Sequence, residues 1–168
     1  FGGSLQDLKA ASRASSLPIL MKDFVVEPVQ IRAGWAAGAS AVLLIARCLD
    51  DTRLHLLYHE VRSLGLDALV EVHNAAELDR ALALEEAIVG INNRDLDTLD
   101  TDRRRAAAIL PCVPPGRIAV AESGYLEPAH LADLHGRADA VLIGTALMRA
   151  TDPSAFLRAA GEPAFARA

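Results

Sequence analysis

The chain has 168 residues, a hydrophobic content of 52% and a mean hydropathy of +0.23, which suit one globular domain and exclude a disordered tail. A formal net charge of −5 without a concentrated basic patch argues against nucleic acid as a partner. No apolar stretch approaches the roughly 20 residues of a membrane span, and no signal segment opens the chain. We therefore expect no membrane partner and a cytoplasmic location.

Short apolar runs, each followed by a helical pattern, recur along the chain and indicate strands of a parallel sheet. The strands are expected at Pro18–Lys22, Ala41–Ile45, Ala68–Val72, Ala87–Ile91, Arg117–Ala121 and Ala138–Ile143. This alternation is typical of a (β/α)8 barrel or of a doubly wound sheet. No strand is followed by the G-x-G-x-x-G fingerprint of dinucleotide-binding folds, which weakens the doubly wound alternative.

Several residues predict where helices begin. Ser4 with Asp7, and Asn74 with Glu77, have the spacing of capping boxes, and Pro28 suits a first helical position. We interpret His73, beside the second box, as an interior or loop-capping histidine rather than a proton shuttle. Trp35 is expected to pack in the core.

The predicted fold class is an incomplete (β/α)8 barrel. A complete barrel has eight strands and about 250 residues, whereas this chain supplies six strand patterns and begins with Phe1 instead of Met. We therefore expect that the first two strands are missing. No linker divides the chain, so residues 1–168 are predicted to form a single partial domain.

Polar side chains stand at the carboxyl ends of four predicted strands. These are Lys22, Glu71, Asn92 and Glu122. Because strand ends converge on one face of a barrel, we expect the four side chains to share one pocket. The alternative is a salt-bridge network at the barrel mouth without catalysis, but active sites are where such groups cluster.

Glycine turns follow the last two strands. Ser123-Gly124 and Gly144-Thr145 occupy the positions where barrels often bind phosphate, because backbone N–H groups there can donate to an anion. Each pair alone could equally make a tight turn. Arg103, Arg104 and Arg105 are expected to form a solvated helix face rather than an anion site. The histidines share no ligand geometry, so no metal site is predicted.

Six stretches resemble the indole-3-glycerol-phosphate synthase family of tryptophan biosynthesis. They are Phe1–Leu5, Met21–Phe24, Leu69–Asn74, Gly90–Leu96, Ala121–Gly124 and Leu142–Met148. The resemblance covers essentially the whole chain. It implies a barrel of the ribulose-phosphate-binding type that needs no metal or organic cofactor. The implied substrate is a small phosphorylated molecule, 1-(2-carboxyphenylamino)-1-deoxyribulose 5-phosphate, whose indole ring closes with loss of carbon dioxide and water.

The resemblance also implies residue roles. Lys22 would be the general acid of ring closure, and Glu71 a general base or acid in the dehydration, while Asn92 and Glu122 would orient the substrate. Arg94 would lie near the carboxylate side of the substrate. Two further sets would bind its remaining parts: Ser123, Gly124, Gly144 and Thr145 the phosphate, and Phe24, Leu43 and Leu96 the aromatic ring.

One departure from the family is large. The E-x-K-x-x-S-P-S stretch of the family's first strand does not occur in this sequence, and Met21 replaces a frequent Arg. Two other functions therefore stay open: an inactive truncated barrel that retains a phosphate site, or another phosphate-binding barrel isomerase. Fusion to, or association with, other enzymes of the tryptophan pathway is a further possibility that the resemblance raises.

Overall fold

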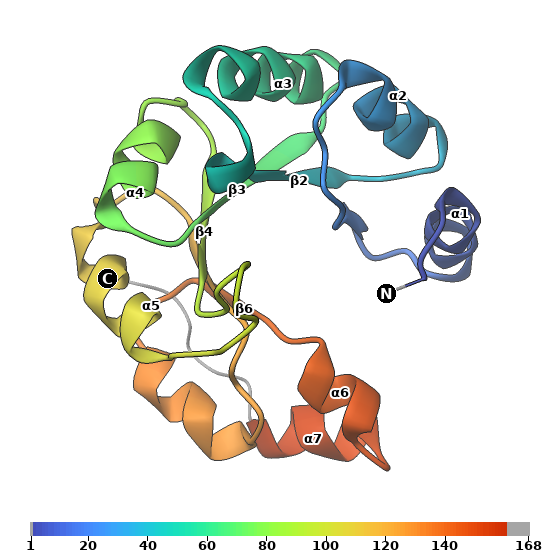
Figure 1. Cartoon of the computed structure of the whole chain (residues 1–168). Helices are drawn as coiled ribbons and strands as arrows, with labels where there is room; N and C mark the ends of the chain where they lie inside the picture. The colour runs from blue at the N-terminus through green and yellow to red at the C-terminus, as the bar shows by residue number, and fades with distance from the viewer. Residues whose placement is uncertain (1, 161–168) are drawn as a thin grey trace. The chain divides into compact units, whose positions relative to one another are not determined.

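The structure is a computed structural model that describes residues 2–160. Phe1 and residues 161–168, the two ends of the predicted domain, lie outside the described residues. The chain divides into two compact units. The first extends to Glu71 and includes Asp79–Ile88, and the second comprises Val72–Leu78 and the chain from Val89. Each unit consists of parallel strands with helices between them (Figure 1).

The first unit contains three parallel strands. They are β1 (Leu20–Met21), β2 (Ala41–Ile45) and β3 (Asp67–Val72). Met21 lies opposite Val42, and Leu43 lies opposite Leu69. Every residue of β2 after Ala41 is buried, as expected for a parallel strand that is covered on both faces.

Helices of the first unit begin at residues that satisfy their exposed backbone N–H groups. They are α1 (Leu5–Ala14), α2 (Pro28–Ala36) and α3 (Asp51–Ser63), with a 3-10 turn η1 (Ala46–Cys48) after β2. The Ser4 and Asp7 side chains cap α1 reciprocally, as predicted. The carboxylate of Asp50 accepts the Arg53 N–H at 2.7 Å at the start of α3. Figure 1 shows α2 and α3 on the same side of β2 and β3.

The helix α4 (Ala75–Leu82) contributes residues to both units. At its start, the Asn74 Oδ1 accepts the Glu77 N–H at 2.9 Å. The Glu77 carboxylate reaches back to the N–H of His73, at 2.7 Å, and to the Asn74 side chain. The predicted capping box is thus present. Its Glu77 carboxylate accepts the N–H of His73, one residue before Asn74.

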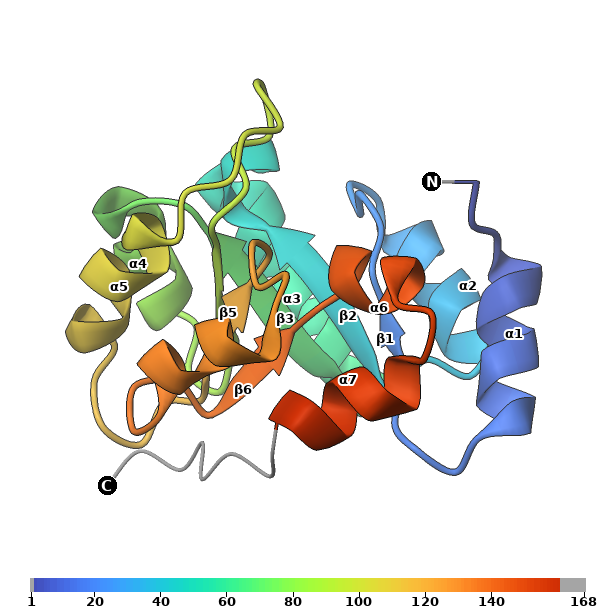
Figure 2. The ribbon, with the colours of Figure 1, turned by 90° about the horizontal axis from the view of Figure 1, so that it is seen from below.

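The second unit contains the other three strands, β4 (Ile88–Asn92), β5 (Ala119–Glu122) and β6 (Ala140–Leu142), again parallel. Between and after them come α5 (Arg104–Ile109), η2 (Leu110–Cys112), η3 (Pro128–Leu134), α6 (Thr145–Arg149) and α7 (Pro153–Ala160). Figure 2 shows the segment between β4 and α5 as a loop that projects away from β5 and β6.

Three details differ from the sequence-based expectations. The first strand is only Leu20–Met21, because Pro18 has no N–H to donate to a ladder. The segment after Pro128 forms a 3-10 helix. Trp35 is 52% exposed, so the expected core position was wrong. The buried residues of α2 are Ile31 and Gly34, and the next position lies about 100° further around the helix.

Six strands, each followed by helical structure, are the repeating βα units of a (β/α)8 barrel, here six of its eight. The predicted fold class is confirmed. Within residues 2–160, no helix combines the length and the apolar character needed to cross a membrane.

Candidate functional site

In the first unit, a lysine and a glutamate meet at the carboxyl ends of two strands. Lys22 directly follows β1, and Glu71 is the second-last residue of β3. The Lys22 Nζ lies 3.8 Å from the Glu71 Oε2. The Glu71 side chain is fully buried, whereas that of Lys22 is 44% exposed. A buried carboxylate requires a nearby cation, and this cation retains access to water.

The predicted apolar wall residues of the first unit differ in their surroundings. Leu43 is buried in the middle of β2. Phe24 lies three residues beyond β1 and is 56% exposed, so its ring is available to a ligand. The third predicted wall residue, Leu96, belongs to the second unit, in the loop after β4.

In the second unit, an amide and a carboxylate end two neighbouring strands. Asn92 is the last residue of β4 and Glu122 the last of β5, and the two are partners in the strand register. Both side chains are buried. Partners in a parallel register point to the same face of the sheet, so the amide and the carboxylate lie side by side.

The turn after β5 has an unusual backbone. Ser123 has φ +62° and Gly124 has φ +82°, so two successive residues are left-handed. A Cβ on Gly124 would stand 2.5 Å from the Thr101 Cγ2, which leaves no room for a side chain. Glycine is therefore required at 124 for both its conformation and its contact with Thr101.

The turn after β6 is less constrained. Gly144 is the N-cap of α6 and has φ −112°, and nothing lies within 4 Å of the position a Cβ would take. Thr145 is the first residue of α6. The open space around Gly144 would let a ligand approach its backbone.

Asn93 joins these elements and is a residue that sequence reasoning missed. Its fully buried side chain donates from Nδ2 to the Ser123 carbonyl at 3.0 Å and to the Tyr125 hydroxyl at 3.1 Å. Its Oδ1 accepts the Ala106 N–H at 2.9 Å. Asn93 thereby orients the Ser123-Gly124 turn and the first turn of α5. A buried asparagine directly after a strand is the signal that could have identified it.

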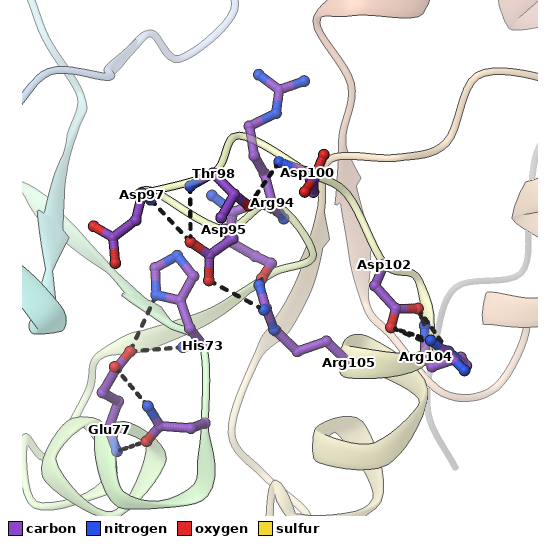
Figure 3. Close-up of polar contacts among 12 residues, drawn as sticks. His73, Glu77, Arg94, Asp95, Asp97, Thr98, Asp100, Asp102, Arg104 and Arg105 are labelled. Atoms are coloured by element: carbon purple, nitrogen blue, oxygen red, sulfur yellow. Dashed lines mark hydrogen bonds and ion pairs between the residues drawn. The ribbon is translucent and has the colours of Figure 1, made fainter.

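The loop after β4 is held by its own side chains (Figure 3). Arg94 and Thr101 pair as an antiparallel bridge. The carboxylate of Asp95 accepts the Asp97 N–H at 2.9 Å and lies 3.5 Å from the Arg105 guanidinium. This loop places Thr101 against Gly124, described above.

A cavity of about 490 Å³ lies entirely within the second unit. Its lining includes three of the predicted site residues, Arg94, Gly124 and Thr145, together with Thr101, Asp102, Arg103, Arg104, Leu126 and Arg149. The Arg94 Nη2 lies 3.5 Å from the Thr145 Oγ1. Hydrogen bonds from Arg104 keep the pKa of the Asp102 carboxyl below its usual value. The cavity is strongly cationic and suits an anion.

The expected solvated face of Arg103, Arg104 and Arg105 divides in the structure. Arg103 and Arg104 line the cavity, and Arg105 pairs with Asp95. A run of three arginines does not show in the sequence which of them turn toward a cavity. The helix α5 begins only at Arg104, and the loop before it sets the direction of these side chains.

His73 and Glu77 form a buried pair away from the cavity lining (Figure 3). The His73 Nδ1 lies 3.1 Å from the Glu77 Oε2. Burial raises the pKa of Glu77, but hydrogen bonds from the His73 ring and backbone outweigh it, so the net shift is downward. The pair therefore acts at the start of α4, as the loop-capping interpretation of His73 expected.

The four predicted catalytic side chains belong to different units. Lys22 and Glu71 lie in the first, and Asn92 and Glu122 in the second. Their meeting in one pocket stays a prediction. Within residues 2–160, no group of three or more His, Cys, Asp or Glu side chains could hold a metal ion.

The fold and these side chains define the class: a (β/α)8-barrel protein with polar groups at the carboxyl ends of its strands. Residues 1–160 match the family described as indole-3-glycerol phosphate synthase. The indole-3-glycerol phosphate synthase of Parafrankia sp. is 48% identical over 158 residues, 94% of this chain and 59% of that protein. That of Opitutus terrae is 44% identical over 163 residues, 94% of this chain and 61% of that protein. The chain belongs to the indole-3-glycerol phosphate synthase family and spans about 60% of the length of these relatives.

Solved structures share the fold at low sequence identity. KGPDC from Streptococcus mutans has a TM-score of 0.70 at 11% identity, over 90% of this chain and 74% of that one. The 3-keto-L-gulonate-6-phosphate decarboxylase of Vibrio cholerae has a TM-score of 0.71 at 14% identity, over 94% and 77% of the two chains. At these identities the likeness concerns the fold alone.

Proposed function

We propose that the complete protein containing this chain is an indole-3-glycerol-phosphate synthase, a carbon–carbon lyase of tryptophan biosynthesis. The observation that carries the proposal is the Lys22–Glu71 pair, a partly exposed ammonium 3.8 Å from a buried carboxylate at the ends of β1 and β3. Membership of the family supports it. The proposed substrate is 1-(2-carboxyphenylamino)-1-deoxyribulose 5-phosphate.

The proposed reaction uses proton transfer rather than a metal or an organic cofactor. The ring carbon that bears the carboxylate attacks the substrate carbonyl carbon, and Lys22 stabilises and protonates the oxygen that gains charge. Carbon dioxide then leaves. The new hydroxyl departs as water, for which Glu71 transfers the proton as base or acid. Asn92 and Glu122 would hold the substrate's polar groups in the reactive orientation.

The remaining predicted residues would bind the two ends of the substrate. Phe24, Leu43 and Leu96 would contact the aromatic ring. Backbone N–H groups at Ser123-Gly124 and Gly144-Thr145 would donate to the phosphate. Arg94 is proposed for the phosphate end as well, because it lies beside Thr145 in the cationic cavity, rather than for the carboxylate end that the resemblance implied.

The test is the substitution Lys22→Met in the complete protein. Methionine keeps the length and apolar stem of the side chain but cannot donate a proton. We expect turnover to fall by orders of magnitude, on the scale of about 10²- to 10⁴-fold for a lost general acid. Binding of the unreactive product analogue glycerol phosphate should change little, since the phosphate residues are intact.

The matched control is Lys9→Met, which removes the same charge from the exposed helix α1. It should leave turnover unchanged. If Lys22→Met also left turnover unchanged, Lys22 would have no part in the reaction. The cavity in the second unit favours one alternative: a chain that binds phosphate without catalysis. In that case the complete protein would bind glycerol phosphate and show no turnover at all.

A further inference from the structure

The cationic cavity contains more positive charge than its own side chains neutralise. Four arginines line it, Arg94, Arg103, Arg104 and Arg149, against a single carboxylate, Asp102. Arg104 donates three hydrogen bonds to that carboxylate, at 2.8 to 3.0 Å. Its charge is therefore compensated within the protein.

The other arginines differ in their partners. Arg94 lies 3.5 Å from the Thr145 hydroxyl, a neutral group. The guanidinium groups of Arg103 and Arg149 have no hydrogen bond and no ion pair with any residue between 2 and 160. Two arginines that have no partner among residues 2–160 thus line a cavity that also exposes Gly124 and Thr145.

The positions of these two arginines follow from the local structure. The Arg103 Cγ lies 3.3 Å from where a Cβ on Gly124 would stand, so its stem packs against the turn after β5. Arg149 lies four residues after Thr145 in α6, which places both on one face of that helix. Each of the two glycine turns therefore has one arginine associated with it, Arg103 at Gly124 and Arg149 at Gly144-Thr145.

We infer that Arg103 and Arg149 are ligands of the phosphate and select a dianionic monoester over a singly charged anion. The inference rests on the proposed function, because it deepens the phosphate site proposed there. The two guanidiniums, which no group in the described part of the chain compensates, match the two negative charges of a phosphomonoester. Each presents planar N–H donors suited to its oxygens. A carboxylate ligand would leave one of the two cations uncompensated.

The test measures the binding of inorganic phosphate to the complete protein by calorimetry, at low salt. Arg103→Gln and Arg149→Gln remove one charge each while keeping most of the side-chain stem. We expect each to weaken phosphate binding roughly five- to tenfold, and the double variant to weaken it more than either single variant. Arg103→Lys should retain only part of the affinity, since it keeps the charge and the packing of the stem against Gly124 but loses the planar donors.

Arg13→Gln is the matched control, since it removes the same charge from an exposed position of α1. It should not change phosphate affinity. Thermal unfolding of each variant would separate a lost ligand from a lost fold. Arg149→Gln is the cleaner variant in this respect because Arg149 is exposed at the end of a helix.

The selectivity is tested with pH. Inorganic phosphate, like a phosphomonoester, is mainly a monoanion at pH 5 and mainly a dianion at pH 8. Phosphate affinity of the wild type should rise between these values, and the rise should be largely absent in the double variant. Asp102 does not explain such a rise, because its pKa is lowered and it stays ionised throughout. Acetate, a monoanion, should bind far more weakly than phosphate.

The outcomes separate this inference from the site on which it rests. Phosphate binding that is equal in the wild type and both glutamine variants would overturn the role of the two arginines and leave the glycine turns as the phosphate site. A wild type that binds no phosphate at all would overturn both the inference and the proposed phosphate site.

Discussion

Asn93 holds the turn after β5 and the start of α5 through three side-chain hydrogen bonds. A serine with φ +62° is conformationally costly, on the order of 1 kcal/mol, and persists only where its surroundings hold it. Asn93 provides that restraint by binding the Ser123 carbonyl and the Tyr125 hydroxyl from one amide. Burial raises the pKa of Tyr125, so its hydroxyl stays protonated at neutral pH. A proposed phosphate turn thus depends on a side chain that is not part of the cavity lining.

At the same scale, Glu77 predicts a pH dependence of stability. Its pKa in the folded chain is lowered, so the ionised carboxylate stabilises the fold. The stabilisation is complete above the unfolded pKa of about 4.3 and is lost as the pH falls through the folded value. Glu77→Gln should lower the free energy of unfolding at pH 7 by about 1–2 kcal/mol, because Gln replaces a charged acceptor of the His73 and Asn74 bonds.

Urea unfolding at pH 7 and pH 3 would measure this effect. The difference between wild type and Glu77→Gln should shrink at pH 3, where the carboxylate is protonated. Asp79→Asn, at an exposed position of the same helix, is the control and should show little effect at either pH. A Glu77→Gln difference that grew toward acid would contradict the assigned direction of the pKa shift.

At the scale of elements, Arg80 connects three segments of the first unit. It lies in the last turn of α4 and donates to the carbonyls of Ala46 at 2.7 Å and of Leu49 at 2.6 Å. Its Nε pairs with Asp51, the first residue of α3. The fork of donors fixes the connection from β2 to α3, which carries no strand pairing of its own.

Arg80→Ala should therefore lower the free energy of unfolding by about 1–3 kcal/mol, because two carbonyls lose a charged donor. Arg80→Lys should recover only part of the loss, since one ammonium cannot reproduce the planar fork. Thermal or urea unfolding would measure both. Arg32→Ala, which breaks an exposed pair with Glu60, should have a smaller effect. An equal loss of unfolding free energy in Arg80→Ala and Arg32→Ala would argue against the connecting role of Arg80.

At the scale of the whole molecule, the division into two units predicts where phosphate acts. All residues that line the cavity belong to the second unit. Titration with inorganic phosphate should shift the backbone amide signals of Arg103, Gly124 and Thr145. Signals of the first unit, such as those of Leu43 and Trp35, should stay in place. Amide signal shifts centred on Lys22 and Glu71 would instead show that phosphate binds in the first unit and would contradict this prediction.

Much of the fold follows from patterns that neighbouring residues carry. Apolar runs predicted all six strands within a few residues, and the Ser4 and Asn74 capping boxes predicted two helix starts. The strand-end rule also anticipated that Lys22 and Glu71 would stand at strand ends, and likewise Asn92 and Glu122. These predictions depend on short spacings and on backbone geometry that the local sequence dictates.

What failed depended on contacts between distant parts of the chain. Trp35 is exposed because α2 packs on β1 through the neighbouring Gly34, whose backbone lies close to the Met21 sulfur. The hydrogen bonds of Asn93 reach residues 30 and 32 positions away. The cavity position of Arg103 depends on the turn at Gly124.

The sequence by itself determined the order and type of the βα units, two helix caps and the polar residues at four strand ends, because these depend on periodicity and near neighbours. Only the tertiary structure decided that Asn92 stands beside Glu122, that Asn93 holds Ser123, and that Arg103 and Arg149 line one cavity. The physical reason is that strand register and loop packing bring together side chains whose separation in the chain carries no local signal.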